Sequence, residues 1–456
     1  MGELIYRTRI PASAEDVFSW HVRPGAFERL APPWERAEIV ERTGSITDGG
    51  RVVVKTGVGP FSVLWVAEHF DYVEGRQFRD RQLRGPFAKW VHTHRFEPDD
   101  HDGSFLEDRI EYELPLGLAG RILGKRFTIN KLNRMFAYRH QTTVDDLAAH
   151  KFYRGGKFMN ILVTGASGLV GSALVPFLTT GGHEVRRLVR GRVNFNNNDY
   201  FWDPYSGSLN KACLEGIDAI VHLSGENIAG RWTAEKKTKL RDSRIKSTRL
   251  LSQTLSELPQ PPKVLVCASA MGYYGHRGDE ILTEESASGG GFLAETVREW
   301  EKQGEPAAKK GIRVVNLRFG IILSPKSGAL KEMLLPFKMG AGGVFGSGEQ
   351  YWSWIAIDDV VGVIYHCVQS QSLSGPVIAA SPNPVTNREF TKTLGRVLKR
   401  PTIFPMPAAA ARLALGEMAD ELLLSSIRLE PKKLKGSGYS FRFPGLEGAL
   451  RHVLGK

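Results

Sequence analysis

The sequence predicts an α+β domain over residues 1–150 and an α/β domain with a doubly wound parallel sheet over residues 159–400, followed by a small helical extension over residues 401–456. The length of 456 residues is that of two or three domains. The first third contains several strand-like runs and ends in a long amphipathic stretch, whereas later apolar runs alternate with helical segments. A polar, glycine-containing segment, residues 151–158, is the predicted linker between the two parts.

The composition is that of an ordinary globular protein, with 42% hydrophobic and 24% charged residues. No apolar run approaches the roughly 18 residues needed to span a bilayer. The start, MGELIYRTRI, lacks the basic-then-apolar layout of a signal peptide. The three cysteines, Cys213, Cys267 and Cys367, are scattered and lack metal-binding spacing. These features predict a cytoplasmic protein with no membrane span and no disulfide framework.

Positive charge is concentrated after the first domain. Residues 1–150 carry 21 basic and 22 acidic residues, whereas the remainder carries 40 and 27. The densest basic stretch, residues 233–251, has Leu240, Ile245 and Leu250 at near-helical spacing, which predicts a helix with one solvated charged face. An excess of positive charge can also bind nucleic acid or a phosphorylated small ligand. Because the solvated helix face explains the densest stretch, we expect no nucleic-acid partner.

The first domain opens with the alternating strand residues LIYRTRI and continues into a helix at residues 11–22. Ser13 is the predicted N-cap of this helix, and Asp16 stands three residues further on. Turn signals such as TDGG and DDHDG then separate further strand-like runs. These runs are AEIVER, RVVVKTG, FSVLWVAEHFD, RQFRDRQL, KWVHTHRFE and FLEDRIEYEL. An antiparallel sheet curled around the closing helix would enclose an interior space.

This element order and the opening IPASAEDVFSWHVRPGAFERLAPP resemble the helix-grip fold of the START-like, or SRPBCC, superfamily over about residues 3–148. Members of that superfamily often bind apolar small molecules, so the resemblance implies a ligand-binding cavity and no particular reaction. The aromatic residues that could line such a cavity are Phe18, Trp20, Phe61, Trp65 and Trp90. Taken singly, each is more readily explained as part of a packed core.

Two histidines, His92 and His94, share one face of a predicted strand, and His101 follows in a loop with several aspartates. Two histidines on a strand and a third on a loop do not define a coordination geometry. We therefore expect a hydrogen-bonded or solvent-facing pair and no metal ion.

The segment ILVTGASGLVGSAL, residues 161–174, has the layout of a phosphate-binding loop, with a strand, a glycine-rich turn and the start of a helix. Gly165 permits the tight turn, Gly168 lets the backbone approach a pyrophosphate, and Gly171 lets helix and strand pack closely. The N–H groups at the start of the helix would bind the phosphates of a dinucleotide. The predicted loop contacts also include Ser167, Leu169 and Val170.

The second strand of this domain, HEVRRLVR, ends at Arg190. A carboxylate at this position would bind the ribose hydroxyls of NAD and repel a 2′-phosphate, whereas arginine pairs with phosphate. Arg190 therefore favours NADP(H) over NAD(H), and Arg192 adds a second positive charge nearby. The alternative, in which Arg190 only faces water, leaves the cofactor preference open.

Three further buried strands are predicted in GIDAIVHLSGEN, PPKVLVCASAMGYYG and IRVVNLRFGIIL. Open parallel sheets bind their ligands beyond the carboxyl ends of the strands. The residues predicted to contact the cofactor there are Leu223, Ser224, Gly225, Ala268 and Arg318, and Trp202 of the FWDP segment is a further predicted contact. The predicted lining of a substrate pocket is Glu226, Asn227 and Phe292.

The motifs TGASGLVG, DAIVHLSG, SAMGYYG and LRFGIIL together resemble the extended short-chain dehydrogenase/reductase superfamily, whose nucleotide-binding domain is of the Rossmann type. FWDP, HLSGENIAGRWT, SRIKSTRLL and GYYG resemble more narrowly an atypical, epimerase-like branch. Its members have sometimes been labelled nucleoside-diphosphate-sugar epimerases or cell-division inhibitor homologues. The resemblance runs from about residue 159 to the end of the sequence and includes the branch's small C-terminal domain.

Enzymes of this superfamily usually use a serine, a tyrosine and a lysine four residues after the tyrosine. The segment that should carry the tyrosine and lysine reads GGGFLAETVREWE, and Phe292 and Thr296 occupy their positions. Only Tyr153 is followed by lysine four residues later, and it precedes the first strand of the domain. Counting back from Tyr274, either Ser269 or Ala270 takes the place of the serine. Ser269 and Tyr274 are therefore the remaining catalytic candidates, and the usual tyrosine–lysine pair is absent.

The leading interpretation is an NADP-binding epimerase- or oxidoreductase-like protein that acts on an unknown small molecule and has an N-terminal ligand-binding cavity. The alternative is a non-catalytic NADP(H) sensor that signals cofactor state through its N-terminal domain. A cell-division role would rest on a family label alone. The expected partners are a small-molecule substrate or an apolar ligand.

Overall fold

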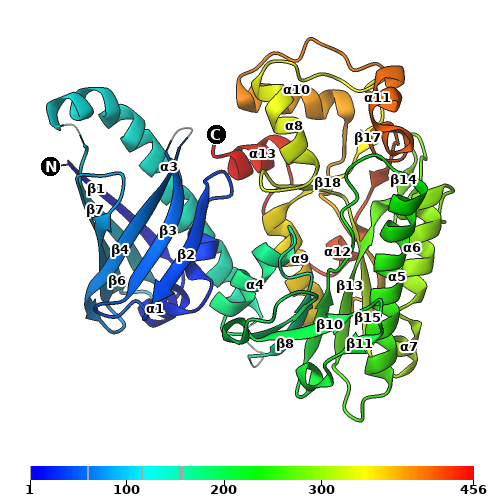
Figure 1. The fold of residues 1–456 in the computed structure, drawn as a ribbon, viewed down its shortest axis with the longest axis horizontal. Helices are drawn as coiled ribbons and strands as arrows, with labels where there is room; N and C mark the ends of the chain where they lie inside the picture. Colours follow the sequence, from blue (N-terminus) through cyan, green and yellow to red (C-terminus); the bar gives the residue numbers. More distant parts are fainter. Residues whose placement is uncertain (1, 59–60, 116, 154–157) are drawn as a thin grey trace. The chain divides into compact units, whose positions relative to one another are not determined.

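The computed structural model divides into two compact units, the first mainly residues 1–157 and the second mainly residues 158–456 (Figure 1). The residues described are 2–58, 61–115, 117–153 and 158–456. Residues 154–157 of the predicted linker lie outside this described part of the chain.

The first unit is built on a seven-stranded antiparallel sheet with the strand order β1-β7-β6-β5-β4-β3-β2. The strands are β1 (Gly2–Ile10), β2 (Ala37–Thr43), β3 (Arg51–Val58), β4 (Phe61–Val73), β5 (Gln77–Arg84), β6 (Lys89–Pro98) and β7 (Ser104–Glu113). Each strand-like run of the sequence forms one of them. Consecutive strands pair from β2 to β7, and β1 pairs with β7.

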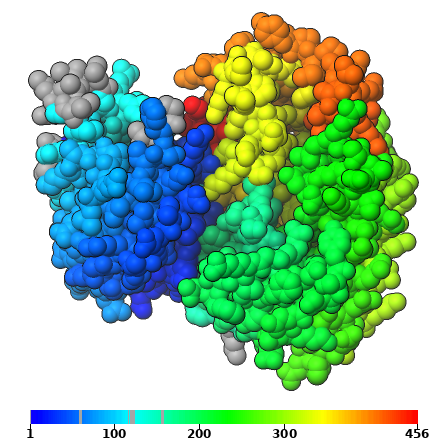
Figure 2. Space-filling view, viewed as in Figure 1, coloured from blue at the N-terminus to red at the C-terminus, as the bar shows by residue number. Residues whose placement is uncertain are grey.

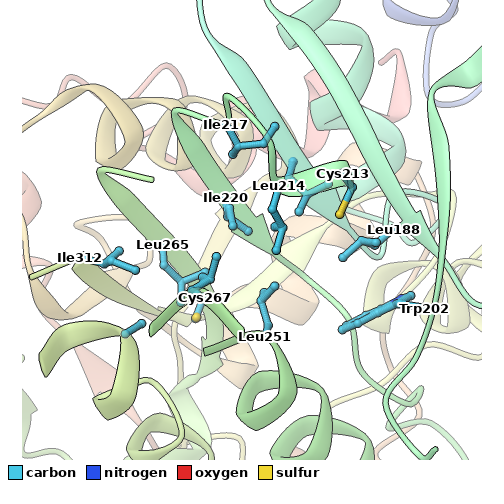
Figure 3. Close-up of a cluster of buried hydrophobic side chains, with 13 residues drawn as sticks. Leu188, Trp202, Cys213, Leu214, Ile217, Ile220, Leu251, Leu265, Cys267 and Ile312 are labelled. Atoms are coloured by element: carbon cyan, nitrogen blue, oxygen red, sulfur yellow. The ribbon is translucent and has the colours of Figure 1, made fainter. Parts of the chain in front are cut away.

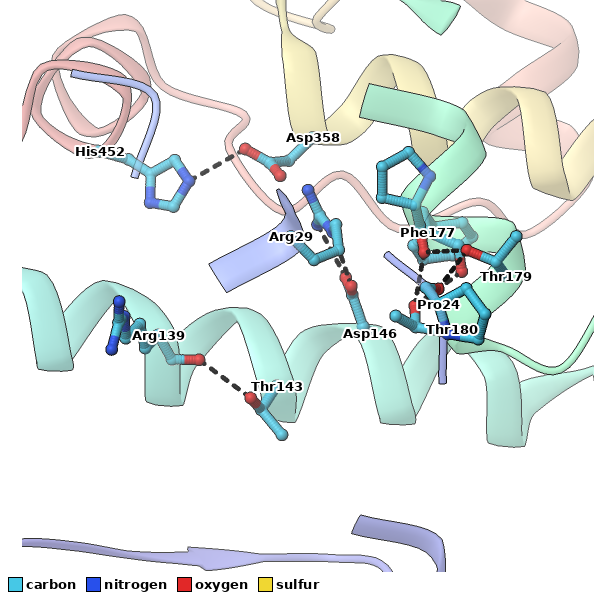
Figure 4. Close-up of polar contacts among 11 residues, drawn as sticks. Pro24, Arg29, Arg139, Thr143, Asp146, Phe177, Thr179, Thr180, Asp358 and His452 are labelled. Atoms are coloured by element: carbon cyan, nitrogen blue, oxygen red, sulfur yellow. Dashed lines mark hydrogen bonds and ion pairs between the residues drawn. The ribbon is translucent and has the colours of Figure 1, made fainter. Parts of the chain in front are cut away.

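Three helices complete this unit: α1 (Ala14–Val22), α2 (Ala26–Leu30) and α3 (Gly117–Phe152). Ser13 caps α1, because its side chain accepts a hydrogen bond of 3.1 Å from the N–H of Asp16. A buried ion pair between Arg29 and Asp146, with N–O distances of 2.7 and 2.8 Å, ties α2 to α3 (Figure 4).

Helix α3 packs on the inner face of the sheet through two apolar clusters. In the first, Leu132 and Phe136 of α3 contact Trp90, Ile110 and Tyr112 of the sheet. The second comprises Ile10, Ala12, Val17, Phe18, Trp20, Ala26, Phe78, Phe96, Leu106 and Leu147. A curled antiparallel sheet that holds a long helix is the predicted helix-grip arrangement, and the structure confirms it.

The aromatic residues singled out in the sequence divide between these clusters and the surface. Phe18, Trp20 and Trp90 belong to the clusters, and Trp65 packs beside the first of them. Phe61 is 74% exposed, so it faces solvent and lines no interior space.

The second unit is built on an eight-stranded sheet with the strand order β11-β10-β9-β8-β12-β13-β15-β19. The strands are β8 (Asn160–Thr164), β9 (Glu184–Val189), β10 (Asp199–Asp203), β11 (Ser208–Leu209), β12 (Ala219–His222), β13 (Val264–Ala270), β15 (Arg313–Phe319) and β19 (Gly375–Ala379). All neighbours are parallel except β10 and β11. The order reverses at β8, between β9 and β12, and open parallel sheets bind ligands at such a switch point.

The helices of this unit begin with α4 and include a long outer helix, α5. They are α4 (Gly171–Thr180), α5 (Ala234–Ser256), α6 (Phe292–Lys302), α7 (Glu305–Lys309), α8 (Ala329–Lys338), α9 (Ile357–Gln369) and α10 (Asn387–Leu398). Helices α5 and α7 cover one face of the sheet, where Leu251 and Ala307 join Leu188 and Leu265 in a buried cluster (Figure 3).

Helix α5 forms part of the outer surface of the second unit, coloured green in Figure 2. On the helix itself, Leu240 and Ile245 are buried, whereas Lys239, Arg241 and Lys246 are exposed. The basic stretch of the sequence is therefore the solvated face of an amphipathic helix, as predicted.

Short elements connect these parts of the second unit. They are η1 (Phe195–Asn197), η2 (Lys211–Leu214), η3 (Met271–Tyr274), β14 (Ile281–Leu282), β16 (Ile321–Leu323), β17 (Tyr351–Trp352), β18 (Trp354–Ala356) and β20 (Val385–Thr386).

The C-terminal residues form the predicted helical extension and belong to the second unit. Its elements are α11 (Ala408–Leu415), the π-helical turn η4 (Ala419–Leu423), β21 (Arg428–Leu429), α12 (Lys432–Gly436) and α13 (Leu446–Leu454). Strand β21 pairs with β14, and a contact of 3.0 Å between His452 and Asp358 ties α13 to α9 (Figure 4). Within the described residues, no helix is both long and apolar enough to cross a membrane.

Candidate functional site

The turn between β8 and α4 places strict demands on two glycines. Gly165 has a φ angle of +68°, and a Cβ atom there would lie 2.8 Å from the backbone of Leu223. A Cβ atom on Gly171 would collide with the carbonyl oxygen of Gly165 and would lie 2.6 Å from Cα of Ala166. Both positions therefore require glycine, and the turn leads from the end of β8 into the start of α4.

The start of α4 offers free backbone donors. The N–H groups of Leu169, Val170 and Gly171 donate to no acceptor among the described residues. Ser167 and Gly168 precede them on the exposed tip of the loop. Free N–H groups at a helix N-terminus attract anions, because they lack intrahelical partners and the helix dipole is positive there. The loop therefore fits the phosphates of a dinucleotide.

Thr164, the last residue of β8, holds the neighbouring loop in place. Its Oγ1 accepts hydrogen bonds from the N–H groups of Leu223 at 3.1 Å and Ser224 at 3.3 Å. The same oxygen lies 2.7 Å from Nδ1 of His222, whose Nε2 lies 3.0 Å from Thr248 Oγ1. Burial lowers the pKa of His222 to about 4, so this ring is neutral at pH 7. Sequence reasoning missed Thr164 and His222, although each ends a strand at the switch point.

The loop after β12 brings three predicted cofactor contacts beside the glycine turn. Leu223 and Ser224 are the backbone neighbours of Gly165. Gly225 is exposed, and a Cβ atom there would lie 3.4 Å from the guanidinium carbon of Arg244 on α5. The structure therefore joins Leu223, Ser224 and Gly225 to the phosphate-binding loop.

The two polar residues of the predicted substrate pocket are held by neighbouring groups. Glu226 forms an ion pair of 2.8 Å with Lys236 of α5, and this hydrogen bond lowers the pKa of the Glu226 carboxyl. Asn227 accepts a hydrogen bond of 3.0 Å from the N–H of Ala229. Glu226 is therefore an ionised carboxylate at pH 7 and holds no proton to donate.

Arg190 follows β9 and is exposed. Its positive charge adds to the larger effect of Lys236 in lowering the pKa of Glu226. It also adds to the backbone hydrogen bonds that lower the pKa of Asp203 at the end of β10. Arg190 thus follows the carboxyl end of β9, and its charge acts on groups at or after the ends of β10 and β12, on the side of the sheet where a cofactor's ribose would be expected.

Trp202 differs from its predicted role as a cofactor contact. The side chain is 1% exposed and belongs to the cluster beneath α5 (Figure 3). Its ring packs edge-on against His222, with 6.0 Å between ring centroids. Successive residues of a strand point to opposite faces, and this register directs Trp202 into the core, so packing accounts for it.

A buried polar network occupies the carboxyl ends of β13 and β15. Glu301 of α6 accepts a hydrogen bond of 2.6 Å from Ser269 and forms a bidentate ion pair with Arg318 at 2.9 and 2.8 Å. Arg318 also donates to the hydroxyl of Tyr274 at 2.9 Å. That hydroxyl donates in turn to the carbonyl of Thr283 at 3.0 Å. Sequence reasoning missed Glu301, which is the centre of this network.

The network fixes the protonation states of its members. Burial raises the pKa of Tyr274 to about 12. Burial alone would lower the pKa of Arg318, but Glu301 raises it above its ordinary value. At neutral pH Tyr274 therefore keeps its proton and Arg318 its charge, and both are held inside the protein by packing and hydrogen bonds.

The predicted cofactor contact Ala268 is half-buried on β13, beside Ser269.

The positions of the missing tyrosine and lysine lie on α6. Thr296 is 4% exposed, and its hydroxyl has no hydrogen-bond partner among the described residues. Phe292 packs on Trp232, with 5.5 Å between ring centroids, and Nζ of Lys237 lies 4.6 Å from the centre of its ring. Met418 of the C-terminal extension joins the same apolar cluster. Phe292 and Thr296 themselves therefore supply no acid or base. Two charged side chains of the described residues lie beside Phe292, namely Lys237 and the half-buried Glu421, and burial raises the pKa of the Glu421 carboxyl.

Comparison with known families identifies three regions of the chain. Residues 161–378 match the model of the NAD dependent epimerase/dehydratase family. Residues 10–136 match the model described as polyketide cyclase / dehydrase and lipid transport. Residues 406–453 match a domain of unknown function.

Curated relatives match about two thirds of the chain. The chain is 42% identical over 294 residues to the epimerase family protein Mb2239 of Mycobacterium bovis, covering 64% of this chain and 97% of the relative. It is 39% identical over 299 residues to YfhF of Bacillus subtilis, covering 65% and 98%. It is 33% identical over 304 residues to human SDR39U1, covering 65% and 100%.

Solved structures extend this relationship to the whole chain. The nucleoside-diphosphate sugar epimerase of Corynebacterium glutamicum matches with a TM-score of 0.81 and 34% identity, covering 99% of this chain and 90% of that one. Human SDR39U1, solved with NADPH, matches with a TM-score of 0.60 and 32% identity, covering 65% and 99%. This chain belongs to the NAD-dependent epimerase/dehydratase family, among the epimerase family proteins related to SDR39U1, and carries an additional N-terminal domain of the polyketide cyclase type.

Proposed function

We propose that the second unit binds NADP(H) at the loop between β8 and α4 and acts on a small molecule as an epimerase- or oxidoreductase-like enzyme. The observation that carries this proposal is the set of unpaired N–H donors of Leu169, Val170 and Gly171 above a turn that only glycine fits. These donors would hold the pyrophosphate. When bound, NADP(H) supplies or accepts a hydride. The NADPH in the human SDR39U1 structure supports the same assignment here.

Arg190 supports a preference for NADP(H) over NAD(H). Its exposed guanidinium follows β9, where the adenine ribose of a dinucleotide lies in this fold, and arginine pairs with a 2′-phosphate. A charge-assisted contact contributes about 1.5–3 kcal/mol. Arg190→Ala should therefore weaken NADPH binding by roughly 10-fold or more and leave NADH binding unchanged.

Fluorescence titration with both cofactors measures this difference. Arg249→Ala is the matched control, because Arg249 is an exposed arginine of α5 that hydrogen-bonds to Gln303. Equal losses for NADPH and NADH in Arg190→Ala, or tighter NADH binding in the unchanged protein, would remove Arg190 from 2′-phosphate recognition.

A non-catalytic NADP(H) sensor is the second candidate, and the network around Glu301 favours it. The hydroxyls of Ser269 and Tyr274 are both engaged by internal partners. The positions of the usual tyrosine and lysine are Phe292 and Thr296. A site with these residues binds a cofactor without the usual proton relay.

Turnover separates the two candidates. An enzyme, supplied with NADPH and a panel of carbonyl compounds and nucleotide sugars, converts at least one of them, and the Gly171→Ala variant loses that conversion. A sensor converts none, yet NADPH changes the protease sensitivity of the first unit. Binding of NADPH with neither turnover nor such a change would defeat both candidates.

We also propose that the first unit binds an apolar small molecule, which would be the substrate or a regulatory ligand. The match to a polyketide cyclase and lipid-transport model and the aromatic residues on the inner face of the sheet support this proposal. Apolar ligands should raise the melting temperature of the full chain. If none of a broad panel does so, the domain is a partner-binding module instead.

A further inference from the structure

The inner face of the first unit's sheet carries a row of titratable side chains at its centre. Asp80 pairs with His92 between β5 and β6, and His94 pairs with Asp108 between β6 and β7. Alternate residues of a strand share one face, so these side chains point together toward α3. His140 approaches the same row from α3.

Asp108 is the hub of this row. Its Oδ1 lies 3.1 Å from Nε2 of His92 and 2.6 Å from Nδ1 of His94, and its Oδ2 lies 2.8 Å from Nε2 of His140. The second ring nitrogen of His92, Nδ1, lies 3.3 Å from Oδ2 of Asp80. The rings of His92 and His94 are 3.9 Å apart between centroids. The two carboxylates therefore lie on different sides of the His92 ring, Asp80 at Nδ1 and Asp108 at Nε2.

The row is buried between the two apolar clusters of the unit. His92 is 4% exposed, His94 8% and Asp108 3%. On β6 the buried aromatic residues on either side of the two histidines are Trp90 and Phe96. Moving charged groups out of water costs several kcal/mol per ion. A domain that needed only a core would continue the apolar pattern through this position, so the polar residues indicate a binding site.

His94 offers a second imidazole beside His92. Its Nδ1 lies 2.6 Å from Oδ1 of Asp108, so this carboxylate pairs with one ring nitrogen, and Nε2 is the nitrogen left to face an ion. Imidazole nitrogen is the commonest metal ligand in proteins.

We propose that Asp80, His92 and His94 bind a divalent transition-metal ion, of the class of zinc and iron(II), inside the first unit. One donor atom from each of these side chains lies within 4.8 Å of the other two. Metal bonds of about 2.0–2.2 Å place neighbouring donors roughly 3–3.5 Å apart. The 3.3 Å between Asp80 and His92 already fits this spacing. Two histidines and one carboxylate leave further coordination positions open to water or a small molecule.

Asp108 and His140 support the proposed site from behind. Asp108 contacts Nε2 of His92 while Nδ1 faces Asp80, and such a contact fixes the tautomer and orientation of a metal-binding histidine. His140 bridges Asp108 and the hydroxyl of Thr8, which lies 2.7 Å from its Nδ1. The carboxylates of Asp80 and Asp108 together balance the charge of a divalent ion.

Metal titration of the chelator-treated full chain tests the proposal. Zn²⁺ should bind with one ion per chain by elemental analysis, and Co²⁺ should give the visible absorption of a nitrogen- and oxygen-bound ion. Asp80→Asn and His94→Gln should each lower Zn²⁺ affinity by at least about 10-fold. The matched controls, Asp100→Asn and His101→Gln on the exposed loop after β6, should leave it unchanged.

Two results with the variants would overturn the site. One is an unchanged affinity in both inner variants, which leaves the row a structural ion-pair network. The other is loss of binding in His101→Gln, which places the ion on the surface. If Asp80→Asn and His94→Gln fail to fold, thermal unfolding of the unchanged chain with and without Zn²⁺ tests the site. Zn²⁺ at about 100 times its dissociation constant should raise the melting temperature by roughly 5 °C or more, and no rise would overturn the site.

Discussion

Gly171 carries the tightest steric requirement of the phosphate-binding loop, because a Cβ atom there would collide with the carbonyl of Gly165. Gly171→Ala should therefore lower the free energy of unfolding by about 1–3 kcal/mol. It should also weaken NADPH binding by at least about 10-fold, since the shifted loop no longer aims its donors at one point. Denaturant unfolding and cofactor titration measure the two effects.

Gly436→Ala is the control for this change. An added Cβ at Gly436 meets no atom within 4 Å, so both quantities should stay within about 0.5 kcal/mol of their original values. Normal NADPH binding by Gly171→Ala would show that the cofactor binds elsewhere.

His222 makes the stability of the second unit depend on pH. Its pKa is lowered from 6.5 to about 4 by burial. The unfolded chain therefore takes up a proton near pH 6.5, while the folded chain takes it up only near pH 4, and the free energy of unfolding falls as the pH drops between these values. For this group alone the loss between pH 7 and pH 5 is about 2 kcal/mol.

Urea unfolding at pH 7 and pH 5 tests this dependence. Glutamine at position 222 does not titrate in this range. Between pH 7 and pH 5 the free energy of unfolding should therefore fall by about 2 kcal/mol less in His222→Gln than in the unchanged protein. Other buried histidines contribute equally to both proteins and cancel in the comparison. An identical pH dependence in the two proteins would mean that His222 is not the titrating group.

At the scale of single residues, the sequence predicted backbone requirements better than side-chain directions. Gly165 and Gly171 were predictable because a tight strand–turn–helix connection requires glycine at both positions. Trp202 was predicted to contact the cofactor, but its strand register turns it into the core. Tyr274 was a catalytic candidate because it follows a strand end, and its hydroxyl is held by Arg318 and Thr283.

At the scale of elements, Glu301 joins helix α6 to two strands of the sheet. Glu301→Ala would leave Arg318 charged, buried and unpaired, and breaking such a pair costs about 3–5 kcal/mol. Glu299→Ala on the same helix is the matched control. Glu299 pairs with Arg241 across the surface, where side chains are 44% and 51% exposed, so its loss should cost about 0.2–1 kcal/mol.

Chemical unfolding of both variants measures the difference. A loss in Glu301→Ala no larger than that in Glu299→Ala would show that the Arg318 side chain reaches water and that the network does not fasten α6 to the sheet.

Elements with a local signal were predictable from the sequence, and contacts between distant elements were not. The cap of α1 follows from Ser13 and Asp16, three residues apart. Glu301 has its partners on β13 and β15, 32 and 17 residues away. No periodicity or spacing connects such positions, because the sheet brings them together only after it has formed.

At the scale of the whole molecule, each unit has apolar clusters of its own. The first contains two such clusters, and a separate cluster lies beneath α5 in the second. A fragment of residues 1–153 should therefore fold alone, with a cooperative thermal transition and the circular dichroism of a mixed sheet and helix. A fragment that is unfolded or aggregates would show that the first unit depends on the second.

The curated relatives cover about two thirds of the chain, whereas the Corynebacterium glutamicum structure covers 99% of it. The composition and charge of residues 1–150 already separated them from the remainder in the sequence. The row of titratable side chains on the inner face of the first unit's sheet was not predictable from the sequence, because Asp80, His92 and Asp108 lie on three different strands.

A crystal structure of the full chain with NADPH would show whether the loop between β8 and α4 binds NADP(H). We expect pyrophosphate oxygens within hydrogen-bond distance of the N–H groups of Leu169, Val170 and Gly171, and the 2′-phosphate against Arg190. A cofactor bound at any other place, or a 2′-phosphate that projects into solvent away from Arg190, would contradict this proposal.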